Sequence, residues 1–458
     1  MSFDYWATHT FVHEYDNAQK QVIDYLLSGN GHLPLTSATI ANITDLAARL
    51  HLLAQAIVTD LKDVARAGSP RQPGGLLHLL SGNQVNDYLA QVKETLAALH
   101  LLPALPDLTL LPIGSFALHF TFTLASPYLS KDDIALHLLD NPVKKEWVFK
   151  LPYVASTQWK GVLEATMVRQ LVEWWQSLDQ SQQQQQKQRK QFVAQRVQLT
   201  RLFGTEIENV QQYLAQCGDE KLNKWHKRYV RRFLSNTGFL AGRLYFYPSF
   251  FDQLSLEVIN PHNRETGAGS LPIYFEAVPR GASGSFTLLY APLDCIGQSE
   301  TETRQQIFAD LQLVAQGLEA MFTHYGFGAK TSSGFGLAEL AGEGRFAIHY
   351  PNAKSQAPRP QEPLYPKEVR EFLESYPAEY LDMKPKQLKD AGVPNRLRQQ
   401  AKVIKDLYLQ YQDTLALYQN ALATWEAAEA TPAPPTTVRG FSTFSDLADI
   451  LPSPIGDA

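Results

Sequence analysis

The segment from His324 to Gly336, "HYGFGAKTSSGFG", combines a bare backbone with a single positive charge. Glycine lets a backbone approach a ligand closely, and free amides beside a lysine suit the negative charge of a phosphate group. The spacing therefore predicts either a phosphate-contacting loop or an ordinary glycine-rich turn. The candidate contacts in this loop are Gly326, Gly328, Lys330, Thr331, Gly334 and Gly336.

The expected elements on either side of this loop argue against the common nucleotide-binding folds. Apolar residues recur at steps of three and four through residues 307–325, which predicts an amphipathic helix before the loop. Residues 335–340 are short and apolar enough for a strand after it. Walker and dinucleotide-binding loops instead run from a strand into a helix, with a different glycine spacing. We therefore expect no NTP or NAD site here.

A second candidate phosphate site lies at the start of a helix predicted from about residue 157. Ser156, Thr157, Lys160 and Gly161 follow one another closely there, in "STQWKG". The first turn of a helix presents unpaired N–H groups, which hydroxyls and a lysine would complete as a phosphate site. The alternative is a capped surface helix whose lysine is simply solvated.

Basic and aromatic residues alternate in "KLNKWHKRYVRRF", residues 221–233. Such a mixture suits single-stranded nucleic acid, because cations pair with phosphates and rings stack on bases. A solvated helix face explains the same charges, and both interpretations remain open. The basic candidates in the segment are Lys224, Lys227, Arg228, Arg231 and Arg232.

The whole-chain composition is that of a soluble protein with a substantial core. The chain has 458 residues, of which 44% are hydrophobic and 19% charged, and a net charge of −5. Nucleic-acid binding would therefore depend on local clusters. Two cysteines argue against a disulfide framework, and His119, His262 and His324 are too scattered to indicate a metal site. The start of the chain lacks the pattern of a signal peptide, and no apolar run reaches about 18 residues, so we expect a cytoplasmic protein.

The elements that would position these residues fall into three regions. Residues 1–110 predict a helical N-terminal extension, and residues 346–458 predict a helical C-terminal extension joined by proline-rich segments. Between them, residues 111–345 predict the order strand, helix, strand, strand, helix, strand, with a glutamine-rich insertion near 176–200. That order is typical of an α+β fold with a ferredoxin-like core. The strand at 114–124 alternates apolar and polar residues, which predicts one buried face.

Five segments between roughly residues 112 and 341 resemble, in order and spacing, the motifs of CRISPR RAMP proteins (repeat-associated mysterious proteins). They are "LPYVASTQWKGVLEA", "RLFGTE", "AGRLYFYPSFFDQLSLEVINPH", "LPIYFEAVPRGASGSF" and "HYGFGAKTSSGFG". The forms N-P-H and G-A-K-T favour the sixth subunit of the Cmr-type (type III-B) effector complex, with a related type III backbone subunit as the competitor. The sequence departs from the family pattern at Glu164, where the motif closes on arginine, and at Pro248–Ser249.

The resemblance implies a ferredoxin-like (RRM-like) RAMP core and a role in antiviral defence. It implies an RNA-binding subunit of a type III CRISPR ribonucleoprotein. The expected partners are guide RNA, complementary target RNA and other effector subunits, and no contact with a membrane is expected. It also adds Arg243 and His262 to the RNA-binding candidates. A scaffold that only joins neighbouring subunits is a further alternative.

Asp140, in "LLDNPVKKEW", is the catalytic candidate that the resemblance implies. Some backbone subunits of the family carry an aspartate in a matching loop that is needed for metal-dependent cleavage of target RNA. Such a carboxylate could hold Mg²⁺ beside a scissile phosphate. The competing interpretation is an Asp-Asn-Pro turn without chemistry. Asp132 and Asp133 are weaker candidates, and we expect a subunit that does not itself cleave RNA.

Overall fold

The computed structural model describes residues 45–56, 59–69, 72–73, 75–133, 137–205, 213–215, 217, 219–231, 239–261, 267, 269, 272–349, 360–430 and 436–449. Two predicted RNA contacts, Arg232 and His262, and the first part of the predicted N-terminal extension lie outside them. The chain divides into two compact units, one of Met1–Tyr350 with Thr436–Ala458 and one of Pro351–Pro435. Helices and antiparallel sheets are both present, which confirms the α+β class.

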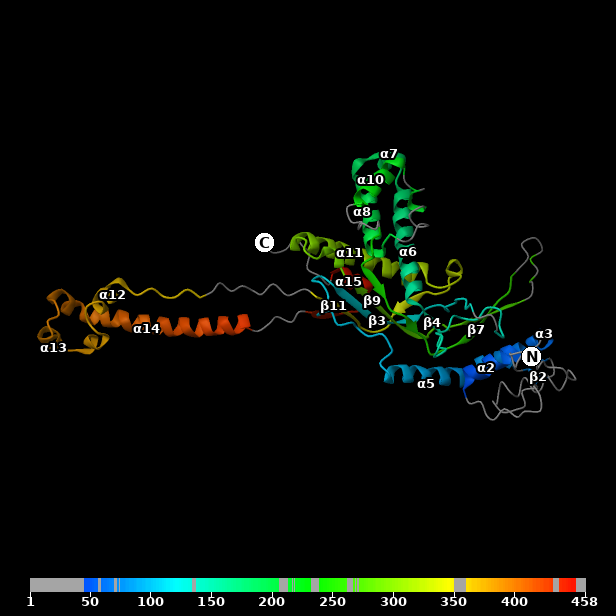
Figure 1. The fold of residues 1–458 in the computed structure, drawn as a ribbon, viewed down its shortest axis with the longest axis horizontal. Coiled ribbons are helices and arrows are strands. Elements are labelled where there is room, and N and C mark those ends of the chain that lie inside the picture. The colour runs from blue at the N-terminus through cyan, green and yellow to red at the C-terminus, as the bar shows by residue number, and fades with distance from the viewer. Residues whose placement is uncertain are drawn as a thin grey trace, which may run out of the picture. The chain divides into compact units, whose positions relative to one another are not determined.

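An antiparallel sheet forms the centre of the first unit (Figure 1). Its strands run in the order β12-β11-β3-β9-β5, and β10 pairs with the same edge of β3 as β11, further along the strand. Two small two-stranded sheets, β4-β6 and β7-β8, lie outside it. The strands of these three sheets are β3 (Phe116–Leu124), β4 (Tyr153–Val154), β5 (Leu244–Phe246), β6 (Ser249–Phe250), β7 (Ser255–Ile259), β8 (Ile273–Ala277), β9 (Ser283–Tyr290), β10 (Ala338–Leu340), β11 (Gly344–Ile348) and β12 (Thr437–Phe441).

The predicted strand at 114–124 corresponds to β3, and its aromatic residues form the centre of the core. Phe116, Phe120 and Phe122 are at most 1% exposed. The helices α6 (Ser156–Ser177) and α11 (Glu300–Ala320) supply the other side of this core, and Trp159 of α6 packs edge-on against Phe122 at a centroid distance of 6.0 Å. The sequence predicts that only one face of β3 is buried. The second face is also partly buried, because Leu108 packs against Ala117.

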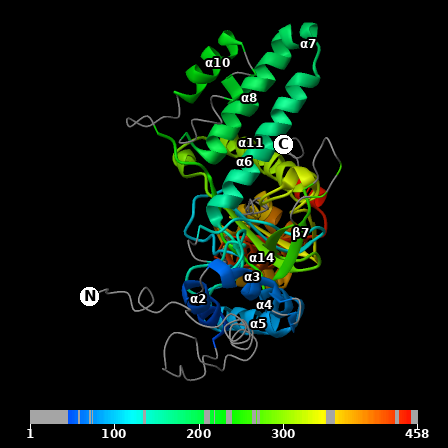
Figure 2. The same ribbon diagram turned by 90° about the vertical axis from the view of Figure 1, so that its right-hand side faces the viewer.

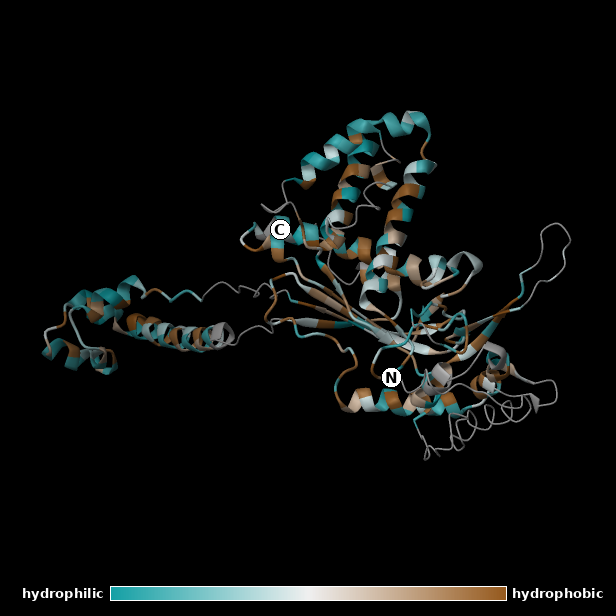
Figure 3. Cartoon of the chain, turned by 45° about the vertical axis from the view of Figure 1, so that its right-hand side comes forward, coloured by the Kyte–Doolittle hydropathy of each residue, from teal (hydrophilic) through white to brown (hydrophobic). Residues whose placement is uncertain are grey.

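The glutamine-rich insertion extends the helices of the core. After α6 come α7 (Gln180–Gln184) and α8 (Gln186–Phe203), and α6 and α8 rise side by side from the sheet (Figures 1 and 2). The outer end of this insertion is largely hydrophilic, shown in teal in Figure 3. The helix α10 (Glu220–Val230) packs along α8, where the Arg196 guanidinium donates to Asn223 Oδ1 at 2.6 Å.

The described part of the N-terminal region is mainly helical. It contains α2 (Leu46–Ala56), α3 (Thr59–Ala67), α4 (Gly75–Ser81) and α5 (Gln84–Ala98), with a short pair of strands, β1 (Gly68–Ser69) and β2 (Gln72–Pro73). The Lys93 ammonium of α5 pairs with Asp252 at 2.8 Å, and Asn86 Oδ1 accepts the Leu254 amide at 2.9 Å. These contacts fix α5 against the chain between β6 and β7.

The C-terminal region differs from the predicted extension. Residues 360–430 form the described part of the second unit, with α12 (Lys367–Leu373), η5 (Ala378–Asp382), α13 (Pro385–Asp390) and the long α14 (Asn395–Ala430) around a separate core. After this unit, β12 pairs with β11 and α15 (Phe444–Asp449) packs against α11. Burial of Phe441 and Phe444 among the core phenylalanines explains why the chain returns to the first unit. The helical unit is therefore an insertion between two paired strands.

Candidate functional site

The glycine loop, residues 326–337, follows α11 and a π-helical turn, η3 (Met321–Tyr325), and leads into β10. This is the predicted order of helix, loop and strand. Three of its glycines lie where a side chain would meet other backbone. A Cβ atom on Gly336 would lie 1.9 Å from the Phe327 carbonyl oxygen, one on Gly326 2.7 Å from the Phe335 carbonyl oxygen, and one on Gly328 2.3 Å from the Leu129 carbonyl oxygen.

Backbone hydrogen bonds hold the same loop, one within it and two to residues 127 and 129, which follow β3. Phe327 donates to the Gly336 carbonyl at 3.0 Å, Gly336 donates to the Pro127 carbonyl at 2.9 Å, and Ala329 donates to the Leu129 carbonyl at 2.7 Å. Gly334 differs from the other glycines, because its φ is +83° but no atom lies within 4 Å of a Cβ built on it. Gly326, Gly328 and Gly336 therefore combine a positive φ with a close approach to backbone, whereas Gly334 has the positive φ alone.

Lys330 lies at the exposed tip of the loop, between Gly328 and Gly334. It adopts a left-handed conformation with φ of +58°, which is uncommon for a residue with a side chain. Its ammonium lies 5.2 Å from the ring centroid of Phe275 in β8. The short 3-10 turn η4 (Thr331–Ser333) begins directly after it. Among the described residues, Lys330 forms no ion pair, and its side chain is exposed.

The structure brings the start of α6 next to the glycine loop. The Tyr128 hydroxyl donates to Gln158 Oε1 at 3.2 Å, while the Tyr128 ring packs against Phe327 at a centroid distance of 5.6 Å. Trp159 also packs on Phe327, at 4.7 Å between centroids. These buried contacts join the glycine loop to the start of α6, two candidate phosphate sites that are separate in the sequence. Neither Tyr128 nor Trp159 was predicted to shape the site, because contacts between residues so far apart in the chain leave no local pattern.

The predicted contacts at the start of α6 are accessible. Thr157 and Gly161 are exposed, Ser156 and Lys160 are half-buried, and a Cβ atom on Gly161 would meet nothing within 4 Å. The N-terminal cap position is Ala155, and no side-chain capping hydrogen bond is formed there. The first turn of α6 therefore lacks the side-chain cap expected of an ordinary surface helix.

Asp140 lies beside β8 and is held by two cations of the N-terminal helices. Its carboxylate oxygens lie 2.8 Å from the Lys62 ammonium and 3.4 Å from the Arg66 guanidinium, both in α3. The hydrogen bond from Lys62 is the main cause that lowers the pKa of Asp140 below its usual range. Asp132 instead accepts the backbone amide of Lys145 at 3.2 Å.

The donor set around Asp140 does not fit a Mg²⁺ site. Mg²⁺ prefers several oxygen ligands in octahedral geometry. Within the described ranges, no group of three or more His, Cys, Asp or Glu side chains could hold a metal ion. The carboxylate of Asp140 contacts two positively charged side chains, whose charges would repel a cation.

The predicted basic cluster forms the outer face of α10. Leu222, His226 and Val230 are buried against the insertion. The basic residues described in this segment, Lys221, Lys224, Lys227, Arg228 and Arg231, are all exposed. Lys224 pairs with Glu220 at 2.7 Å, so its charge is partly compensated. The amphipathic arrangement agrees with both interpretations of the cluster, a nucleic-acid surface and a solvated helix face.

Arg243 is a correction to the predicted RNA contacts, because its side chain is buried. It is 2% exposed and lies before β5, where it pairs with Asp294 at 2.5 Å and with Asp310 at 3.1 Å. It also donates to the Tyr290 hydroxyl at 2.9 Å. Burial lowers the pKa of Arg243, but the hydrogen bonds that it donates to Asp294 and the neighbouring negative charges raise the pKa above its usual value. Its donors are used inside the protein, which leaves none for RNA.

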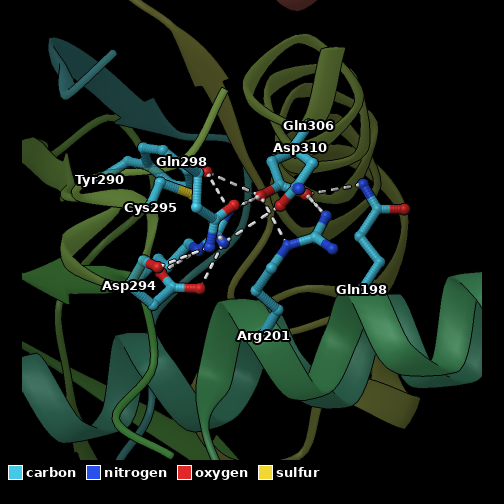
Figure 4. Close-up of polar contacts among 9 residues, drawn as sticks. Gln198, Arg201, Tyr290, Asp294, Cys295, Gln298, Gln306 and Asp310 are labelled. Carbon is cyan, nitrogen blue, oxygen red and sulfur yellow. Dashed lines mark hydrogen bonds and ion pairs between the residues drawn. The ribbon is translucent and has the colours of Figure 1, made fainter. Parts of the chain in front are cut away.

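Asp310 of α11 is the acceptor at the centre of this buried polar cluster (Figure 4). It is fully buried and accepts from the Tyr290 hydroxyl at 2.8 Å, from Gln198 at 3.0 Å and from Arg201 at 2.5 Å, as well as from Arg243. Gln198 and Arg201 belong to α8. The cluster therefore ties the helical insertion to α11 and to the end of β9.

Glu164, at the position where the family motif has arginine, is 5% exposed on α6. Burial raises its pKa from the ordinary 4.5 to about 7, against the opposing effect of Lys160. The folded state therefore favours the protonated carboxyl, and the contribution of Glu164 to stability is largest below pH 4.5 and is lost as the pH rises towards 7.

We therefore expect Glu164→Gln to flatten the fall in the free energy of unfolding between pH 5 and pH 8, since the amide cannot ionise. Chemical denaturation of the wild type and the variant at several pH values measures this difference. Glu319→Gln, an exposed substitution on α11, is the control and should leave the profile unchanged. Parallel profiles for the wild type and Glu164→Gln would contradict the assignment.

Solved structures of low similarity to this chain include three CRISPR proteins. A chain of the type III-B Cmr-beta complex bound to cognate target RNA has a TM-score of 0.29 and 13% identity, covering 71% of this chain and 88% of that one. Cmr6 from Pyrococcus furiosus has a TM-score of 0.26 and 15% identity, covering 50% and 99%. A chain of a CRISPR RNA-guided surveillance complex has a TM-score of 0.30 and 12% identity, covering 61% and 86%.

No protein-family model and no curated protein matches the sequence. The structural similarities are too weak to carry an argument of their own, so the function depends on the residues and their geometry. In the described part of the chain, every helix is too short or too polar to cross a membrane.

Proposed function

We propose that the chain is an RNA-binding subunit of a type III CRISPR effector ribonucleoprotein, in contact with guide RNA and target RNA. The observation that carries the proposal is the junction of the glycine loop with the start of α6. Two segments that resemble RAMP motifs meet there through Tyr128 and Trp159, with Lys330 exposed in the glycine loop and Lys160 half-buried at the start of α6. Exposed lysines and accessible backbone amides are the groups that contact phosphates.

The topology of the sheet supports a ferredoxin-like core for this subunit. The chain order β3-α6-β5-β9-α11-β10 has the alternation of a β-α-β-β-α-β unit. Its strands lie in the order β5-β9-β3-β10, and all their pairings are antiparallel. The strands β11 and β12 and the helical insertions would be additions to that core.

Replacing Lys330 by alanine is expected to weaken RNA binding with little loss of stability, because the side chain is exposed and its charge would pair with a phosphate. The slope of log affinity against log salt should fall by about one, and the loss should be larger at low salt. Lys160→Ala should behave alike. Binding of labelled single-stranded RNA over a salt series measures both, with exposed Lys386→Ala in α13 as the control. Unchanged binding by both variants would refute the proposed site.

Slicing of target RNA by this subunit is the competing function, and the contacts of Asp140 do not favour it. In a complex assembled with Asp140→Ala, we expect the products of target cleavage with Mg²⁺ to be unchanged, because both carboxylate oxygens are already paired with cations. Stability should fall by only about 1 kcal/mol or less, as for exposed ion pairs. A denaturing gel resolves the products, with Asp390→Ala, an exposed residue of α13, as the control. Loss of one product with intact binding would make this chain a nuclease.

A further inference from the structure

The chain between Lys144 and Tyr153 forms a tightly bonded turn ahead of α6. Glu146 donates its backbone amide to the Leu151 carbonyl at 2.8 Å, and Lys150 donates to the Glu146 carbonyl at 3.0 Å. The Glu146 carboxylate accepts the amides of Val148 at 2.8 Å and Phe149 at 2.6 Å. These bonds satisfy the backbone of the turn internally and hold it in one conformation.

This turn presents a large aromatic side chain to solvent. Trp147 is 76% exposed and the neighbouring Val148 is 70% exposed. A tryptophan normally buries most of its area, so a rigid turn that keeps one outside the core indicates a binding role. The Lys150 ammonium lies 4.7 Å from the centroid of the Trp147 ring, so a cation accompanies the ring.

The charges around the turn distinguish between the classes of partner. Lys145 is paired with the buried carboxylate of Glu276. Lys144 and Lys150 are half-buried and form no ion pair with any residue in the described ranges. Lysine is depleted in protein–protein interfaces, whereas a ring flanked by cations is the arrangement that binds single-stranded nucleic acid.

We propose that Trp147 is a stacking platform for a base of single-stranded RNA, with Lys144 and Lys150 beside it for the adjoining phosphates. The proposal rests on the proposed RNA-binding function and adds a contact outside the glycine loop and the start of α6. The Lys150 ammonium lies over the Trp147 ring, and a base would stack on the part of the ring that is exposed to solvent. The contact would not depend on the base, because every base offers a π-face.

The test compares Trp147→Ala and Trp147→Phe in the full-length chain, with a homopolymeric single-stranded RNA and with the same oligonucleotide carrying abasic positions. Trp147→Ala is expected to lower the affinity for the intact oligonucleotide by roughly five- to 150-fold, from the usual strength of one base–ring contact. Trp147→Phe should retain most of the affinity. The loss should be much smaller with the abasic oligonucleotide, and melting temperatures should stay unchanged because the residue is exposed.

The outcomes separate this site from the proposed function. If the wild type binds no RNA, both proposals fall. If Lys330→Ala weakens binding while Trp147→Ala does not, the stacking platform alone is refuted. If Trp147→Ala leaves RNA affinity unchanged but prevents association with another effector subunit, the turn is a protein interface. An equal loss with intact and abasic oligonucleotides would also overturn stacking.

Discussion

Asp310→Ala is expected to lower the free energy of unfolding by about 3–5 kcal/mol, one of the largest effects for a substitution in this chain. The carboxylate is fully buried and accepts hydrogen bonds from Arg201, Arg243, Tyr290 and Gln198. Its removal would leave the buried Arg243 with Asp294 alone, and would take the acidic partner from Arg201, whose side chain is 11% exposed. An uncompensated buried charge costs far more than the hydrogen bonds that it replaces.

Denaturant unfolding of Asp310→Ala and of the control Glu319→Ala, an exposed residue on the same helix, measures this effect. The control should change stability by less than about 0.5 kcal/mol. Since the cluster joins α8 to α11, the insertion should also become more sensitive to proteolysis in the Asp310 variant. A loss below about 1 kcal/mol for Asp310→Ala would show that the cluster is not the junction described above.

Gly336→Ala is expected to destabilise the chain by roughly 3–5 kcal/mol and to abolish RNA binding as a consequence. The glycine has φ of +76°, and an added Cβ atom would overlap the Phe327 carbonyl oxygen at 1.9 Å. The contact is with backbone that is itself hydrogen-bonded to Gly336, so it cannot move away without opening the loop.

Gly334→Ala provides a matched control within the same loop. Its φ of +83° is also positive, but an added Cβ atom would meet nothing within 4 Å. The expected cost is about 1–2 kcal/mol of backbone strain, with RNA binding retained. Thermal melting and RNA binding of both variants distinguish the two cases. Equal stability of the two variants would contradict the role given to close approach at Gly336.

Local sequence patterns were sufficient for the elements whose signals are local. The alternation in residues 114–124 predicted β3, and the three- and four-residue steps in 307–325 predicted α11 with the turn that follows it. The glycine loop could be located for the same reason, because the glycines that allow its backbone conformation lie close together in the sequence. The exposed basic face of α10 also follows from helical spacing.

Long-range pairing explains what the sequence could not reveal. The resemblance placed Arg243 among the RNA contacts, yet its partners Asp294 and Asp310 come from η2 (Leu293–Cys295) and α11, and nothing near Arg243 marks them as partners. The cations that neutralise Asp140 come from α3, outside the region of resemblance. In the same way, the return of residues 437–441 to β11 depends on pairing across the whole second unit.

The pairing of β11 with β12 has a consequence for the order of folding. Ile348 and Thr437 are direct partners in the ladder, so the whole helical unit is a loop that begins and ends at one rung of the sheet. The entropic cost of closing a flexible loop rises only slowly with its length. The strand β12 can nevertheless pair with β11 only after the intervening helical unit has been synthesised, whereas the pairing of β3 with β9 does not require that unit. During synthesis, the sheet would therefore carry an unpaired edge at β11 until residues 437–441 emerge, and the helical unit, with its own core, can fold in that interval.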